Sequence, residues 1–234
     1  MCRKLVLLFT IIVALFCLSF QIASGKKNIQ FIIKPMFNTE ALVLNTTKYN
    51  TDTNDTVSIT TLKFYISNLV VEYEDGTRFK DKQSVRLIDV ERLETLSFQL
   101  KQTPDLKMKR IYFQIGIDSL TNVSGNLDGD LDPALGMYWA WNSGYINMKL
   151  EGKSSSCKSV KKEFQFHIGG YLPQQNALQE MSLVMPENAE TIHLKVDLNK
   201  WLSNVALKEN NSLMIPGKKA IEMAKCYKNM FTIE

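Results

Sequence analysis

The sequence predicts a mainly β protein: an antiparallel β-sandwich with a long motif-bearing loop and a C-terminal helix. Three observations support this fold class. Segments in which apolar and polar residues alternate recur at short spacing along the chain. Turn-type residues, rather than crossover helices, separate these segments. Apolar residues at three- and four-residue spacing appear late in the chain, over residues 218–229.

The N-terminal half begins with an alternating strand from residue 29 to Pro35. Residues 38–61 are rich in Asn, Thr and Asp, and they predict a long loop around a short strand at 41–44. A strong strand follows over residues 62–74 and ends in a Glu-Asp-Gly turn.

Further strands are expected over residues 84–90, 96–100, 110–117, 145–150, 164–168, 181–184 and 191–198. A short helix is expected at 201–207, and Pro216-Gly217 opens the C-terminal helix. Because the chain shows no internal repeat and no low-complexity linker, residues 26–234 are interpreted as a single domain.

Residues 1–25 have the layout of a secretory signal peptide. Basic Arg3 and Lys4 precede an apolar run, and small residues follow at 23–25. The run is about 16 residues long, short of the ~20 that a membrane-spanning helix needs. We expect cleavage, export to the periplasm or the outer cell surface, and no membrane span in the mature chain.

Composition and charge narrow the functional classes. Hydrophobic residues make up 45% of the chain and charged residues 22%, as in folded globular proteins. The net charge of +4 falls to +2 without Arg3 and Lys4, which is too little for a nucleic-acid-binding protein. Cys157 and Cys226 lie outside the signal, and whether they form a disulfide stays open.

The sequence has no phosphate-binding glycine loop and no Gly-x-Ser-x-Gly nucleophile motif, so we do not expect an enzyme. Its two histidines cannot form a three-histidine metal site. His193 falls on the polar face of its strand. His167 lies on the polar face of another strand beside Gly169-Gly170, either as a half-exposed strand residue or as a metal ligand.

An acidic segment could hold calcium. Oxygen-bearing residues alternate around a glycine at Asn126, Asp128, Asp130 and Asp132. The EF-hand glutamate is missing, so the pattern predicts either another type of calcium loop or an acidic turn.

Trp139 and Trp141 share one face if their segment is extended, and Met137 is next to them. They are either an aromatic pair in a wall of the fold or part of a soft-metal site near His167.

Longer motifs carry a resemblance to a known family. The chain resembles the methanobactin-associated copper-binding (MbnP-like) proteins over nearly all of residues 28–234. The central motif is Leu131-Asp-Pro-Ala-Leu-Gly-Met-Tyr-Trp-Ala-Trp-Asn-Ser-Gly-Tyr145, followed by Lys149-Leu-Glu-Gly152 and Phe166-His-Ile-Gly169. Shorter matches are Tyr65-Ile-Ser-Asn68, Leu87-Ile-Asp89, Gly116-Ile-Asp118 and Met230-Phe231.

The resemblance implies an exported, mostly β protein that binds copper as Cu(I) for acquisition or storage. It also implies that a di-haem partner of the cytochrome c peroxidase type oxidises one tryptophan to kynurenine, which joins histidine at the copper. Trp139 and Trp141 are the candidates, Trp139 being favoured, and His167 is the histidine. Relatives use two histidines, whereas this chain has Asn211 where we look for the second. Met137 and Met214 are further candidate copper ligands.

The alternative is a surface β-sandwich module that binds protein or glycan. In that case Trp139, Trp141 and Tyr145 form an aromatic platform, and the acidic segment holds calcium.

Overall fold

The computed structural model describes residues 25–125, 128–187 and 189–234. The proposed signal peptide, except for Gly25, therefore lies outside the described residues. The strands in chain order are β1 (Lys26–Phe37), β2 (Glu40–Ala41), β3 (Tyr49–Asn50), β4 (Thr56–Tyr73), β5 (Arg78–Lys80), β6 (Val85–Asp89), β7 (Ser97–Pro104), β8 (Met108–Ile115), β9 (Tyr138–Trp139), β10 (Gly144–Ser154), β11 (Glu163–Gly169), β12 (Gln179–Val184), β13 (Thr191–Asp197), β14 (Ser212–Leu213) and β15 (Phe231–Ile233).

The helices are short. The α-helices are α2 (Ser119–Val123), α3 (Leu198–Leu202) and α4 (Lys218–Lys225), and the 3-10 turns are η1 (Leu93–Leu96), η2 (Gly129–Leu131), η3 (Pro133–Leu135) and η4 (Cys226–Asn229). The C-terminal helix is confirmed, and its last turn is η4. The short helix expected at 201–207 begins earlier, because the Asp197 side chain accepts the Asn199 N–H and caps α3. In the described part of the chain, no helix is long and apolar enough to cross a membrane.

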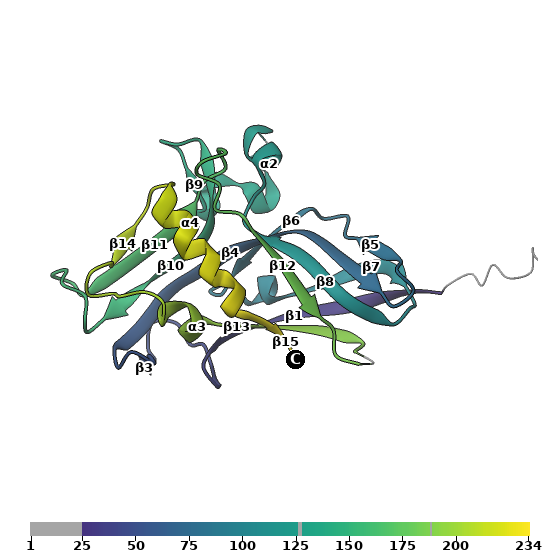
Figure 1. Ribbon diagram of the computed structural model, residues 1–234, viewed down its shortest axis with the longest axis horizontal. Helices are drawn as coiled ribbons and strands as arrows, with labels where there is room; N and C mark the ends of the chain where they lie inside the picture. The colour runs from purple at the N-terminus through teal and green to yellow at the C-terminus, as the bar shows by residue number, and fades with distance from the viewer. Residues whose placement is uncertain (1–24, 126–127, 188) are drawn as a thin grey trace, which may run out of the picture.

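Two mixed sheets make up the fold (Figure 1). Within the described residues, the smaller sheet has the order β15-β13-β1-β2, with β7 also paired to β1. The larger, curled sheet has the order β12-β8-β4-β10-β11-β14, with β3, β5 and β6 paired to β4 and β9 paired to β10. The expected β-sandwich-like fold is confirmed. Parallel pairing of β1 with β13, and of β11 with β14, makes both sheets mixed; long connections between these strands permit it.

The long loop expected over residues 38–61 is shorter in the structure, because β4 begins at Thr56. Val57 and Ile59 are buried and alternate with partly exposed neighbours, so this stretch is an ordinary half-buried strand. Threonine suits a pleated strand because it is β-branched. The Asn- and Thr-rich composition was therefore a misleading guide to the end of the loop.

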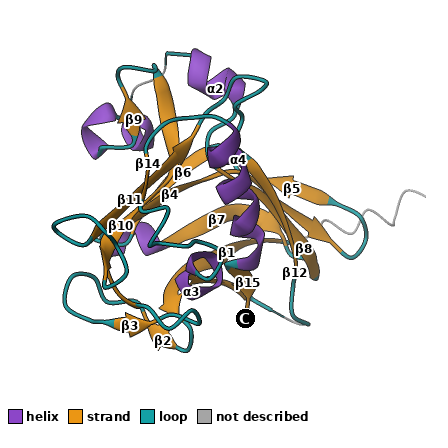
Figure 2. Ribbon diagram, turned by 60° about the vertical axis from the view of Figure 1, so that its left-hand side comes forward, coloured by secondary structure: helices purple, strands orange, loops and turns teal. Residues whose placement is uncertain are grey.

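The main core fills the space between the sheets, and helices close one end of it. Trp201 of α3 is fully buried and packs edge-on against Phe166 of β11, with ring centroids 5.3 Å apart. Its indole N–H donates to the Met223 carbonyl of α4 at 3.0 Å. Figure 2 shows α4 lying across the strands next to α3. The indole of Trp201 thus connects both helices to the larger sheet.

A second, smaller apolar cluster lies on the outer face of the larger sheet. In β4, Leu62 and Phe64 point into the main core, so Lys63 and Tyr65 point outward. The outer cluster consists of Tyr65, Leu87, Ile117, Leu131, Met137, Trp139, Tyr145 and Ile146. The segment that contains α2 and β9 forms its lid and projects at the top of Figure 1.

Hydrogen bonds fix this segment to the sheet. The Tyr65 hydroxyl donates to the Asp130 carbonyl, and the Tyr145 hydroxyl donates to the Leu131 carbonyl, both at 3.0 Å. The Asn122 side chain of α2 accepts the Tyr145 N–H at 3.0 Å. The described part of the long motif-bearing loop is therefore held against the outer face.

Candidate metal centre

His167 lies on the outer face of the larger sheet, between buried Phe166 and Ile168. Its side chain is 14% exposed, and Nε2 is 2.7 Å from Oε1 of Glu151 on neighbouring β10. The other oxygen of Glu151 accepts the Thr61 hydroxyl of β4 at 3.1 Å. Three adjacent strands therefore hold one hydrogen-bonded chain of side chains.

Burial, more than the neighbouring charges, keeps the imidazole neutral. Burial lowers the pKa of His167, and the nearby Lys149 ammonium lowers it further, outweighing the opposing effect of Glu151. Burial alone raises the pKa of Glu151, but the hydrogen bond with His167 and the charge of Lys149 outweigh it, so the pKa lies below its usual range. The pair is therefore a carboxylate and a neutral imidazole at pH 7, and a neutral imidazole is the form that binds metals.

A row of charged residues continues from His167 across the sheet. Lys149 pairs in register with His167 on one side and with Lys63 on the other. Lys63 forms an ion pair of 2.8 Å with Asp89 of β6 and donates to the Leu135 carbonyl at 3.4 Å. This row borders the outer apolar cluster and contacts the segment above it.

Trp139 packs against Gly169 of β11, the strand of His167. It is 6% exposed, and a Cβ built on Gly169 would lie 3.0 Å from its Cζ3 atom. The indole therefore covers Gly169, two residues along β11 from His167 and on the same face. Trp141 is 63% exposed, and its ring centroid is 5.7 Å from that of Trp139.

The two methionines differ in position. Phe166 of β11 pairs in parallel with Leu213, the last residue of β14, and Met214 directly follows this pair. Met214 is 40% exposed at this edge of the sheet. Met137 is buried in the outer cluster, and its carbonyl accepts the Ile146 N–H. Met214 is therefore the accessible thioether of the two, and it follows the strand that pairs with β11.

A second histidine is not placed at this position. His193 belongs to β13 of the smaller sheet. It faces away from the main core as expected, but it is half-buried, and its Nδ1 is enclosed with no hydrogen-bond partner among the described residues. Asn211 donates its amide to the Glu163 carbonyl at the start of β11. Within the described residues, no three His, Cys, Asp or Glu side chains gather as a metal-binding group.

The candidate donors His167 and Met214 are of the kinds that bind Cu(I). A neutral imidazole and a thioether are the borderline and soft ligands that this ion prefers. An indole converted to kynurenine would add an aromatic amine on the same face.

The aspartates of the acidic segment have local roles in the structure. Asp128 accepts the N–H of Gly129, and Asp132 accepts the N–H of Ala134, so each caps a 3-10 turn. Asp130 accepts from the Gln83 side chain at 3.2 Å. Asp128 and Asp130 also line a cavity of about 480 Å³. Asn126 lies outside the described residues, and calcium binding stays a prediction.

Cys157 and Cys226 are free thiols, so the disulfide that the sequence left open is not formed in the structure. Cys157 is buried and contacts the Leu207 carbonyl, whereas Cys226 contacts the Glu222 carbonyl within its own helix. Burial raises the pKa of the Cys157 thiol, which keeps it protonated and unreactive.

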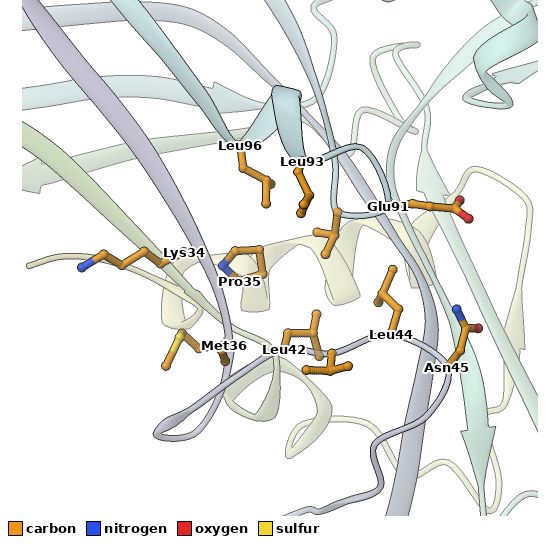
Figure 3. Close-up of a pocket in the computed structure, with 12 residues that line it drawn as sticks. Lys34, Pro35, Met36, Leu42, Leu44, Asn45, Glu91, Leu93 and Leu96 are labelled. Carbon is orange, nitrogen blue, oxygen red and sulfur yellow. The ribbon is translucent and has the colours of Figure 1, made fainter.

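An apolar pocket of about 630 Å³ opens elsewhere, where β7 and β2 pair with different parts of β1. Figure 3 shows Leu42, Leu44, Leu93 and Leu96 pointing toward one another, while the charged ends of Lys34 and Glu91 point away. A ligand site normally adds a few converging polar groups to an apolar wall. None of the candidate metal ligands lines this pocket.

Sequence reasoning proposed His167 and Trp139 as site residues but gave no site role to Glu151, Thr61 or Lys149. All three are polar residues on outward positions of predicted strands. The alternation shows that they face outward, but it does not show which of them meet. Only the cross-strand register brings them to His167.

Comparisons with known proteins agree with this architecture. No curated protein matches the chain significantly. Among solved structures, MbnP from Methylosinus trichosporium superimposes with a TM-score of 0.56 and 12% sequence identity, covering 82% of this chain and 83% of that one. At this identity the likeness shows the fold alone. The family model of MbnP matches residues 26–215, most of the described protein, and the chain therefore belongs to the MbnP family.

Proposed function

We propose that this protein is an exported copper-binding protein that holds Cu(I) for acquisition or storage. The observation that carries the proposal is the placement of His167: a neutral imidazole on the outer face, two residues along β11 from Gly169, which Trp139 covers, on the strand that pairs with β14 just before Met214. Membership of the MbnP family supports a copper-related role. The protein acts as a binder, and no catalytic step by its own residues is part of the proposal.

Trp139 is the better candidate for oxidation to kynurenine, because it lies over the strand of His167. Conversion would replace the indole N–H, which only donates, with an aniline nitrogen that has a lone pair for copper. Trp141 is exposed and its ring adjoins that of Trp139, so a di-haem partner that supplies the oxidising equivalents would contact Trp141 first.

Copper loading of the mature protein tests this function. We expect the parent to retain Cu(I) in competition with a chromogenic chelator, and His167→Ala to lose most of this affinity. His193→Ala is the matched control, because it removes a histidine from the other sheet. Equal affinity of His167→Ala and the parent would reject His167 as a ligand. No affinity in any form, including protein co-expressed with the partner, would reject the copper function.

Mass spectrometry of co-expressed protein tests the modification separately. Kynurenine differs from tryptophan by one added oxygen atom and one lost carbon atom. We expect this change in the parent and in Trp141→Phe, but not in Trp139→Phe. A modified Trp139→Phe variant would instead assign the change to Trp141.

The alternative, a module that binds protein or glycan, has one observation in its favour, the exposed Trp141. The proposed platform of three aromatic residues is not available in the structure, since Trp139 is 6% exposed and Tyr145 is 2% exposed. Binding of a glycan or protein that Trp141→Ala abolishes, with copper affinity unchanged, would favour this alternative.

A further inference from the structure

The contact between His167 and Glu151 determines more than the charge of the ring. An ionised carboxylate has no proton to donate and accepts hydrogen bonds with both oxygens. Since Nε2 of His167 is 2.7 Å from Oε1 of Glu151, Nε2 must carry the proton of this bond. In the neutral ring, the lone pair available for a metal is then on Nδ1.

Glu151 is itself held in place, so it can direct the ring. Its second oxygen accepts the Thr61 hydroxyl at 3.1 Å, and Lys149 Nζ approaches Oε1 to 3.7 Å. In the sheet, Glu151 lies between Thr61 of β4 and Gln165 of β11, and diagonally across from His167. Contacts from two neighbouring strands therefore restrict both the carboxylate and the imidazole.

We propose that Glu151 is a positioning residue of the copper centre, which fixes His167 as the Nε2–H tautomer and reserves Nδ1 as the metal-binding atom. Metal-binding histidines commonly donate their other ring N–H to a carboxylate or carbonyl, and loss of that partner weakens metal binding. The metal part of the inference rests on the proposed copper function. The tautomer part concerns the metal-free protein and can be tested alone.

The tautomer is measured by two-bond ¹H–¹⁵N NMR correlations of the imidazole rings in metal-free protein. The chain has two histidines, so His193→Ala leaves a single ring to assign. We expect His167 of the parent to be the Nε2–H tautomer at neutral pH. In Glu151→Gln, whose side-chain amide can donate to Nε2, we expect the Nδ1–H tautomer to gain population.

Glu163→Gln is the matched control. Glu163 faces outward on β11 but has no contact with His167 among the interactions of the described residues. It should leave the His167 spectrum and copper affinity as in the parent. Glu151→Asp keeps an acceptor and should retain the parent tautomer better than Glu151→Gln, which separates positioning from simple loss of structure.

Copper affinity completes the test. On binding Cu(I), we expect Glu151→Gln to lose about 10- to 100-fold in affinity, the usual effect of removing such a partner. An Nδ1–H tautomer in the parent, or an unchanged tautomer and affinity in Glu151→Gln, would overturn the inference. A parent that shows the Nε2–H tautomer but binds no copper would overturn the copper function and leave the tautomer assignment intact.

Discussion

The two apolar clusters of this protein differ in how they are built. The main core lies between the sheets and is formed largely by the inward-facing residues of their strands. The outer cluster has eight buried members and depends on a segment placed over one face of a sheet and held there by tyrosine hydroxyls. The difference teaches that the first cluster maintains the fold, whereas the second maintains the site. Substitutions should separate these two roles.

The largest effect is expected from Trp201→Ala, in the main core. This change removes a fully buried indole and its bond to Met223, and should cost about 3–5 kcal/mol of unfolding free energy. Urea denaturation followed by circular dichroism measures it. Trp141→Ala is the control and should change stability little, because Trp141 is exposed. Similar losses in both variants would contradict the assignment of Trp201 to the core.

Gly169→Ala tests the contact between β11 and the outer cluster at Trp139. The added Cβ would lie 2.5 Å from the Tyr145 carbonyl oxygen and 3.0 Å from Trp139, so the indole and the β10 backbone must move. We expect a loss of about 1–3 kcal/mol and a change in Trp139 fluorescence. Gln165→Ala, on the same face of β11, is the control. Unchanged fluorescence in Gly169→Ala would show that the indole does not cover this glycine.

Tyr65→Phe should act on the outer cluster alone. It removes the hydrogen bond to the Asp130 carbonyl, which contributes about 0.5–1.5 kcal/mol. Hydrogen exchange should accelerate over residues 128–142 and stay unchanged in β1 and β13. Tyr227→Phe provides a matched control, since the Tyr227 hydroxyl is buried without a partner among the described residues. Faster exchange throughout the protein would show that the two clusters open together as one cooperative unit.

The smallest effect concerns pH. The pKa of His167 in the folded protein lies below its ordinary value of 6.5, chiefly because of burial. The unfolded chain therefore binds more protons, so stability falls as the pH drops below 6.5 toward the folded pKa. His167→Gln should flatten this part of the curve of unfolding free energy against pH. A curve identical to that of the parent would show that the His167 imidazole is in a solvent-like environment in the folded protein.

Much of the fold could be predicted from the sequence, because burial on one face leaves a period of two. The strand at residues 191–198 and the outward position of His167 follow from this pattern. The same alternation was present at Val57 and Ile59, but the polar composition around them masked it.

The site could be predicted only in part. His167 and Glu151 are 16 positions apart, and their contact depends on how the turn between β10 and β11 sets the register. The strand that precedes Met214 joins β11 through a parallel pairing between segments far apart in the sequence. Local patterns contain neither piece of information, because both depend on the complete arrangement of strands.

One strand, β10, belongs to both regions. Met148 and Leu150 face the interior, while Lys149 and Glu151 face outward on the alternate positions. Packing in the core thus constrains only every second residue of β10. The outward-facing side chains can be replaced without repacking the core. Proteins with this backbone can therefore exchange one set of ligands for another while the architecture that carries them stays the same.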